Sequence, residues 1–174
     1  FSTVDHFPKV LLNEAETFDD YVEIYNSEGF PVFIGLWRLT IYDGDDLRGT
    51  FVFPMNTILA PDEVIVVYRL GATSRFVTDF FFLWGASTDP GEAILQHSRA
   101  YENAGYFTAD DGIDYVGFNV VNSHLPANMT WTGSLVGASG QYNFYRNKVV
   151  DTDDASDWSL RNDSPDEGSK NPGQ

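Results

Sequence analysis

Apolar and polar residues alternate with a period of two along much of the chain. In 21–26, Val22 and Ile24 fall on one face and Tyr21, Glu23 and Tyr25 on the other. Side chains of a β-strand point alternately to its two faces, so this period predicts strands. No stretch of helical length carries an apolar stripe with a period of 3.6 residues. The pattern predicts an all-β protein.

Eight to ten short strands are expected, separated by turn residues at intervals of about eight to twelve positions. Asn13 and Glu14 are expected to end the first strand, and the cluster 43–46 (Asp-Gly-Asp-Asp) forms a turn by residue chemistry. This spacing is typical of an immunoglobulin-like β-sandwich. The expected strands are 9–12, 21–26, 30–34, 37–42, 49–53, 64–68, 80–84, 93–97, 115–121 and 142–146.

The length of 174 residues fits a single domain, 1–174. From Asp151 onward the composition shifts to Asp, Ser, Asn, Pro and Gly, so we expect 159–174 to be a polar exit segment packed along the sandwich. Residues 1–10 are a candidate strand for exchange with, or docking on, a neighbouring subunit. Because the chain opens at Phe1 without an initiator Met, we expect any targeting peptide to have been removed or to lie outside it.

Composition excludes several classes of function. Ten Lys and Arg against 26 Asp and Glu give a net charge of −16, which repels phosphate backbones and disfavours nucleic-acid partners. The absence of cysteine excludes disulfides, thiolate zinc sites and cysteine nucleophiles. Aromatic residues make up 16% of the chain, which excludes disorder for its bulk. No apolar run approaches the ~20 residues of a membrane helix, so no membrane insertion is expected.

Several segments follow one another in a characteristic order: 11–14 (Leu-Leu-Asn-Glu), 20–26 (Asp-Tyr-Val-Glu-Ile-Tyr-Asn), 37–40 (Trp-Arg-Leu-Thr), 51–53 (Phe-Val-Phe), 57–61 (Thr-Ile-Leu-Ala-Pro), 64–68 and 111–116 (Asp-Gly-Ile-Asp-Tyr-Val). This succession resembles the lamin tail domain family, an immunoglobulin-like β-sandwich. The close of the chain, from Arg146 through Trp158 to Pro165, resembles the ending of bacterial secreted members.

The chain departs from the family pattern at three places. Gly35-Leu36 precedes Trp37 where the family has a small pair such as Ser-Gly, so the entry into this strand is expected to differ. Asp62 follows Pro61 where Gly is usual, which a type I turn tolerates. The region 69–109 is longer than the family core, so it must hold extra strands or a long loop.

The resemblance implies a non-catalytic module that binds protein partners, extracellular or at the cell surface. We expect a structural protein that contacts other proteins, including copies of itself in a filament. The alternative is an accessory binding or anchoring domain of a larger secreted hydrolase, dependent on calcium.

Catalysis has little support in the residues. Glu14 and Glu23 could lie on adjacent strands at the spacing of a glycosidase pair, but both fall within the fold motifs and are expected to be structural. His6, His97 and His124 are scattered, and the serines beside two of them would point to the opposite strand face. We expect no enzyme and no catalytic residues.

Clustered aspartates are the candidate metal ligands. Asp151, Asp153, Asp154 and Asp157 could converge on one calcium ion, which prefers hard oxygen ligands. The alternative is a solvated turn without a metal ion, in which these side chains cap nearby backbone amides. Four carboxylates within seven residues repel one another, and either a cation or Arg146 and Arg161 must offset that repulsion.

The sequence contains candidate sites for attached glycans and candidate residues for binding sugars. Asn128 begins the glycosylation sequon Asn128-Met129-Thr130, and Asn162-Asp163-Ser164 is a poorer sequon because Pro165 follows. Trp131, Tyr142 and Tyr145 are candidates for stacking on sugar rings.

A run of aromatic residues has a different expected role. Phe80, Phe81, Phe82 and Trp84 are expected to be buried, either in the core or against a partner.

Overall fold

The computed structural model describes residues 9–18, 20–72, 76–80, 82, 84, 88–97, 112–120, 124–138, 143–148, 150–162 and 168. Its elements are β1 (Val10–Glu16), β2 (Tyr21–Asn26), β3 (Val32–Phe33), β4 (Arg38–Asp43), β5 (Asp46–Val52), β6 (Ile58–Leu59), β7 (Val64–Tyr68), β8 (Phe76–Val77), β9 (Gly91–Gln96), β10 (Gly112–Phe118), β11 (Asn143–Arg146), the 3-10 turn η2 (Ala155–Asp157) and β12 (Trp158–Arg161). No α-helix occurs in the described residues.

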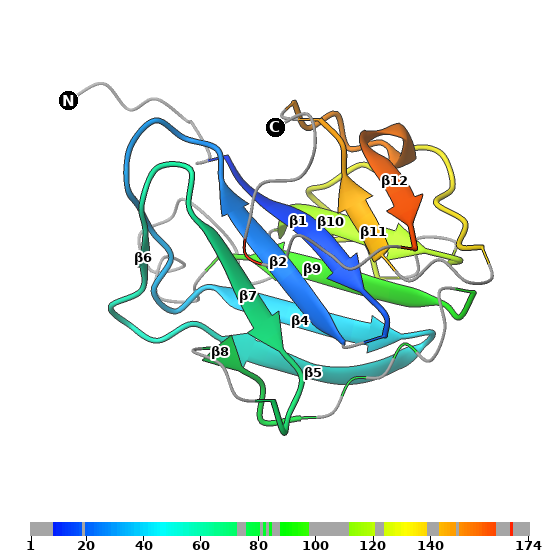
Figure 1. Cartoon of the computed structure of the whole chain (residues 1–174), viewed down its shortest axis with the longest axis horizontal. Helices are drawn as coiled ribbons and strands as arrows, with labels where there is room; N and C mark the ends of the chain where they lie inside the picture. The colour runs from blue at the N-terminus through cyan, green and yellow to red at the C-terminus, as the bar shows by residue number, and fades with distance from the viewer. Residues whose placement is uncertain are drawn as a thin grey trace.

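Two sheets pack face to face (Figure 1). One has the strand order β12-β11-β1-β2-β7-β8 and the other β10-β9-β4-β5, while β3 and β6 form a separate two-stranded ribbon. All pairs are antiparallel except β7 with β8. The all-β, immunoglobulin-like sandwich predicted from the alternation is therefore confirmed.

Alternation decides which side chains fill the space between the sheets. Val22 and Ile24 of β2 face Leu39 and Ile41 of β4 in one core, and all four are fully buried. The residues between them on β4 point to the opposite face of the four-stranded sheet. That outer face holds the candidate site.

A buried ion pair joins the two sheets within this core. Arg146 of β11 donates through Nη2 to both carboxylate oxygens of Asp114 on β10, at 2.9 and 2.7 Å, and through Nε to the carbonyl of Leu12 on β1 at 2.8 Å. Asp114 in turn accepts the backbone N–H groups of Leu12 and Tyr115. The guanidinium also lies over the ring of Trp158, 5.0 Å from its centroid. Burying such a pair carries a desolvation penalty. Removing one partner is more destabilising still, because it leaves an uncompensated charge in the core.

Two predicted strands, 21–26 and 64–68, have the observed bounds. Others are shifted by one to three residues, as for β5, β9 and β10. The turn predicted at 43–46 joins β4 to β5. For the predicted strand 142–146, β11 covers 143–146, and Tyr142 lies outside the described residues.

Three expectations were wrong. Asn13 and Glu14 do not end the first strand: β1 continues to Glu16 across an irregularity between Leu12 and Glu14. At 80–84 the described residues are not in a strand, although Phe82 and Trp84 are fully buried as core anchors. Asp62 has a φ of +62°, which a type I turn does not allow.

The predicted terminal segments are only partly described. Residues 1–8, 163–167 and 169–174 lie outside the described residues. Ser159–Arg161, the start of the predicted exit segment, belongs to β12. Further on, the backbone N–H of Gly168 donates to Glu23 on the outer face of the six-stranded sheet.

Candidate functional site: a groove on the four-stranded sheet

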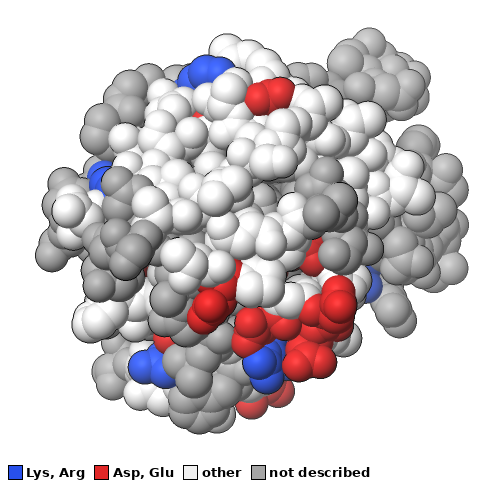
Figure 2. Space-filling view, turned by 90° about the vertical axis from the view of Figure 1, so that its right-hand side faces the viewer, with Lys and Arg blue, Asp and Glu red and all other residues white. Residues whose placement is uncertain are grey.

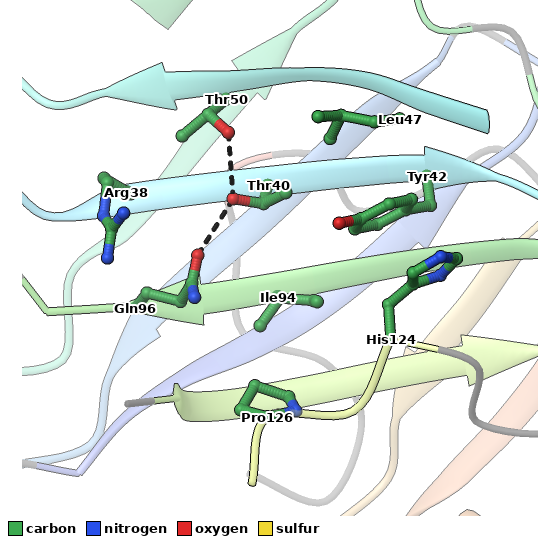
Figure 3. A pocket seen from close by; sticks show the side chains of 9 residues that line it. All are labelled: Arg38, Thr40, Tyr42, Leu47, Thr50, Ile94, Gln96, His124 and Pro126. Atoms are coloured by element: carbon green, nitrogen blue, oxygen red, sulfur yellow. Dashed lines mark hydrogen bonds between the residues drawn. The ribbon is translucent and has the colours of Figure 1, made fainter. Parts of the chain in front are cut away.

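A groove of about 380 Å³ lies on the outer face of the four-stranded sheet (Figure 3). Strands β4, β5 and β9 and the segment after β10 build it. It is lined by Arg38, Thr40 and Tyr42 of β4, Leu47 and Thr50 of β5, Ile94 and Gln96 of β9, and His124 and Pro126. The β4 residues are alternate positions of the strand, which is why they share this face.

His124 is fixed to the sheet by Glu92 of β9. Glu92 is fully buried and accepts hydrogen bonds from Nδ1 and from the backbone N–H of His124. The hydroxyl of Tyr115 donates to Oε1 of the same carboxylate, the oxygen that also accepts the backbone N–H of His124. In the tautomer in which Nδ1 carries the proton and donates to Glu92, Nε2 is a hydrogen-bond acceptor.

Tyr42 stacks on His124. The ring centroids are 3.6 Å apart and the planes differ by 7°. Burial and then the charge of Glu92 raise the pKa of Tyr42. Burial, and then the hydrogen bond to Glu92 and its charge, raise the pKa of Tyr115. Both hydroxyls therefore stay protonated at neutral pH, so Tyr42 presents a donor to the groove.

A chain of hydrogen bonds crosses the floor of the groove (Figure 3). Thr40 Oγ1 donates to Gln96 Oε1 at 2.9 Å and is 3.1 Å from Thr50 Oγ1. Since the single hydroxyl proton of Thr40 goes to Gln96, Thr50 must donate to Thr40. This fixes the Gln96 amide with its oxygen turned toward Thr40, and within the described residues its Nε2 has no hydrogen-bond partner.

The two ends of the groove differ in the side chains that surround them. Arg38 lies at the start of β4, where its Nε donates to the carbonyl of His97 at 3.4 Å. At the other end, the β4–β5 turn exposes Asp45 and Asp46, and Arg48 pairs with Asp43. Figure 2 shows acidic side chains gathered in the lower half of the face toward which this end of the sheet points. An arginine therefore lies at one end of the groove, and the acidic β4–β5 turn lies beyond the other end.

The predicted calcium ligands are bound by the chain itself. Asp151 pairs with Arg146 at 2.9 Å, and Asp157 pairs with Lys148 at 3.0 Å. Asp154 accepts the backbone N–H of Ser156 at 2.7 Å, the capping role of the alternative interpretation. Within the described residues, no group of three or more His, Asp or Glu side chains is arranged to hold a metal. Calcium at this cluster stays a prediction.

Cations from the chain offset part of the predicted repulsion. Arg146 does so as expected, but Arg161 does not: it pairs with Glu14 at 2.9 Å, and Lys148 takes its place at the cluster. Burial and the charge of Asp151 raise the pKa of Asp153. Hydrogen bonds from Thr132 and Ser156 lower the pKa of Asp154.

Asn128, the predicted glycosylation site, is exposed but engaged. Its Oδ1 accepts the N–H of Gly112 at 2.8 Å, and its Nδ2 donates to the carbonyl of the same residue at 2.9 Å. The side-chain amide thereby imitates a paired strand residue at the start of β10. Glycosylation of Asn128 is untested, and Asp163 and Ser164 of the second sequon lie outside the described residues.

Glu14 and Glu23 are direct cross-strand partners of β1 and β2, and both are fully buried. Glu14 accepts from Tyr21 and Arg161, both at 2.9 Å. Glu23 accepts from Asn13 Nδ2 at 2.9 Å and from Gly168. These contacts match the structural role that was expected for the two carboxylates.

The remaining aromatic and histidine residues singled out from the sequence lie away from the groove or outside the described residues. Trp131 is 9% exposed and packs edge-on against Tyr115, so its ring is not presented to a sugar. Tyr145 lies under the guanidinium of Arg161. His97 is buried against Trp37, and His6 lies outside the described residues.

The groove itself was missed at the level of sequence. The alternation of Arg38, Thr40 and Tyr42 was a usable signal for an outward face. Nothing near His124 in the chain, however, indicates that it stacks on Tyr42.

Among the described residues, no helix has the length and apolar character needed to cross a membrane. No curated protein matches the chain. A comparison with protein-family models matches residues 6–164 to the Lamin Tail Domain. Because this match covers most of its length, the chain belongs to the lamin tail domain family, whose immunoglobulin-like fold is a protein-interaction module.

Proposed function

We propose that this chain acts outside the cell or at its surface as a non-catalytic module, and that it binds a protein partner through the groove on the four-stranded sheet. The observation that carries the proposal is the groove's fixed polar lining. Tyr42 is held by stacking and Gln96 by Thr40, while the Tyr42 hydroxyl and the Gln96 Nε2 have no partner within the described residues.

Preorganisation makes such a surface effective. Side chains already ordered in the free protein lose little conformational entropy when a partner binds. The buried Glu92 anchors His124, which in turn orients Tyr42. The proposal does not need catalysis: in the described part of the chain, the imidazole of His124 bonds to a carboxylate and to no hydroxyl that could serve as a nucleophile.

Site-specific photocrosslinking tests the site of binding. A benzoylphenylalanine at Leu47, which is 57% exposed at the groove, is compared with one at Val150, which is 65% exposed and does not line it. We expect a protein adduct in the native host at position 47 that Tyr42→Ala abolishes. An adduct formed equally at position 150, or one indifferent to Tyr42→Ala, would contradict the proposal.

The extracellular location rests on the acidic surface and on the resemblance of the chain's ending to secreted members. Labelling of intact cells with an antibody tests it directly. Signal from the culture medium or from unpermeabilised cells supports the proposal, and signal that appears only after permeabilisation contradicts it.

Self-association is the second form of the proposal. It is favoured by three exposed apolar side chains near the β3–β6 ribbon: Phe33, Met55 and Ile58. Salt should promote association, because it screens the repulsion between chains of charge −16. Sedimentation velocity at low and high salt measures this self-association.

The mass of the native polypeptide separates a self-associating module from an accessory domain of a larger hydrolase.

A further inference from the structure

The only sulfur atoms of the chain belong to Met55 and Met129, because the sequence contains two methionines and no cysteine. We propose that Met55 is a modification site: hydrogen peroxide oxidises its thioether to the sulfoxide and thereby makes an apolar patch of the surface polar. The patch consists of Phe33, Met55 and Ile58, and we call it the ribbon patch. Its use in self-association rests on the proposed function, whereas the oxidation of Met55 does not.

Met55 and Met129 lie in different surroundings. Met55 is 63% exposed. Met129 is half-buried and packs against the hydrophobic core. Its Sδ lies 2.1 Å from the position that a Cβ on Gly112 would occupy, and Pro126 Cγ lies 2.8 Å from the same position. An oxidant must touch the sulfur to react with it, so peroxide should oxidise Met55 first.

The backbone around Met55 is held by hydrogen bonds that do not involve its side chain. The carbonyl of Pro54 accepts the N–H and the hydroxyl of Thr57, at 2.9 and 2.7 Å. The N–H of Ile34 donates to the carbonyl of Thr57 at 3.0 Å. An oxygen added to the exposed thioether leaves these contacts in place, so the oxidised chain should keep its fold.

Met55 lies beside two other exposed apolar residues. Phe33 of β3 is 44% exposed and Ile58 of β6 is 54% exposed. The two are direct cross-strand partners, so their side chains project from the same face of the β3–β6 ribbon. A Cβ on Gly35 would lie 2.5 Å from Phe33 Cζ and 2.0 Å from the carbonyl oxygen of Met55, which places the Phe33 ring next to the Met55 turn.

The chain around the ribbon patch is uncharged, although the whole chain has a net charge of −16. The segments 29–37 and 49–61 contain no Asp, Glu, Lys, Arg or His. Hydrogen peroxide is a small neutral molecule, so the field of an acidic protein does not repel it. A sulfoxide is polar where the thioether was apolar. One added oxygen therefore changes the character of this patch.

The oxidation transfers one oxygen atom and two electrons. A lone pair of the Met55 sulfur attacks one oxygen of hydrogen peroxide, and the S–O bond forms as the O–O bond breaks. The other oxygen takes a proton from the first and leaves as water, so sulfur is oxidised and the peroxide is reduced. Methionine sulfoxide reductase reverses the change: two thiols become a disulfide, and the sulfoxide oxygen leaves as water.

Peptide mass spectrometry after brief treatment with dilute hydrogen peroxide tests the selectivity of the oxidation. In the folded 174-residue chain, Met55 should gain an oxygen about tenfold faster than Met129, or more, because only Met55 is largely exposed. In concentrated urea the two rates should become similar, since both sulfur atoms are then accessible. Equal rates in the folded chain would overturn the inference.

Hydrophobic-interaction chromatography measures the polarity of the ribbon patch without requiring self-association. Peroxide should shorten the retention of the wild-type chain, and methionine sulfoxide reductase with dithiothreitol should restore it. Met55→Leu keeps the patch apolar but removes its sulfur, so its retention should not change with peroxide. The matched control Met129→Leu should respond as the wild type does, with an unchanged circular dichroism spectrum. A shortened retention that persists in Met55→Leu, or an unchanged retention once Met55 is oxidised, would overturn the inference.

Sedimentation velocity at high salt separates the inference from the proposed self-association. The Met55 sulfoxide form should associate roughly fivefold more weakly than the reduced chain, or less tightly still, because association must desolvate the sulfoxide. An oxidised chain that associates as tightly as the reduced chain would overturn the inference. A reduced chain that stays monomeric at every salt concentration would contradict the proposed self-association instead. Selective oxidation with a reversible loss of retention would then still support Met55 as an oxidation site.

Discussion

Leu36 adopts a backbone conformation that favours glycine. Its φ is +66°, and the turn is held by hydrogen bonds from Leu36 N to Phe53 O and from Trp37 N to Ile34 O, both 3.0 Å. A left-handed conformation costs a residue with a Cβ about 1–2 kcal/mol. The small pair that the family resemblance leads one to expect before Trp37 would avoid this cost. The departure noted in the sequence is therefore a strained position.

Substitutions at Leu36 should show the strain. Leu36→Gly should leave the free energy of unfolding unchanged or raise it by up to about 1 kcal/mol, since relief of strain is partly offset by the flexibility of glycine in the unfolded chain. Leu36→Val should lower it by about 1–2 kcal/mol, because β-branched residues resist positive φ. Urea denaturation measures both. A glycine variant less stable than the valine variant would refute this explanation.

The Arg146–Asp114 pair should behave as a unit. Arg146→Met leaves the carboxylate of Asp114 buried without its cation and should lower the free energy of unfolding by about 3–5 kcal/mol. The double variant Arg146→Met/Asp114→Asn should be about 1–2 kcal/mol more stable than Arg146→Met alone, because no unpaired charge remains. A double-mutant cycle by chemical denaturation measures the coupling. Strictly additive losses would contradict it.

Asn128 should matter for stability even without a glycan. Asn128→Ala removes both bonds to Gly112 and should lower the melting temperature, with a loss of about 1 kcal/mol. Thr130→Ala destroys the sequon but leaves those bonds intact, so it should change stability little. Differential scanning calorimetry of protein from a non-glycosylating host makes the comparison. Equal effects of the two substitutions would count against a structural role for Asn128.

At the scale of the element, alternation predicted the strands well where one face is apolar. It succeeded for β2 and β7, whose inward residues are aliphatic and evenly spaced. It failed at 80–84, because consecutive aromatic residues carry no period. Phe82 and Trp84 are buried by aromatic contacts with each other and with Phe118, and not by strand pairing.

The acidic turn η2 should respond to pH. Burial acts to raise the pKa of Asp157, but hydrogen bonds from Thr152 and Lys148 outweigh it and lower that pKa. An unfolded Asp titrates near pH ~3.9. Asp157 therefore contributes stability above about pH 4, and this contribution is lost as the pH falls through the lower folded pKa.

Thermal unfolding between about pH 5 and pH 2.5 measures this dependence. The wild-type melting temperature should fall on acidification below about pH 4, and Asp157→Asn should flatten the fall. Lys9→Glu, which changes an exposed charge elsewhere, should leave the slope as it is. The same slope in wild type and Asp157→Asn would show that η2 does not carry the dependence.

At the scale of the whole molecule, the fold was predictable and the groove was not. The groove requires the register that places Thr40 between Thr50 and Ile94, together with a loop that returns His124 to Tyr42 from more than eighty residues away in the chain. Strand periodicity contains neither piece of information. The net charge of −16 follows from the sequence, but the position of the acidic β4–β5 turn beyond one end of the groove does not.

The central claim is that the groove on the four-stranded sheet is where this module binds its partner. Two-dimensional NMR of the labelled chain during titration with the partner identified by crosslinking at Leu47 tests it most directly. We predict that the largest shifts occur at the side-chain amide of Gln96 and the backbone amides of Tyr42, Leu47 and His124. Largest shifts at the β3–β6 ribbon or at β12, with the Gln96 amide unmoved, would contradict the claim.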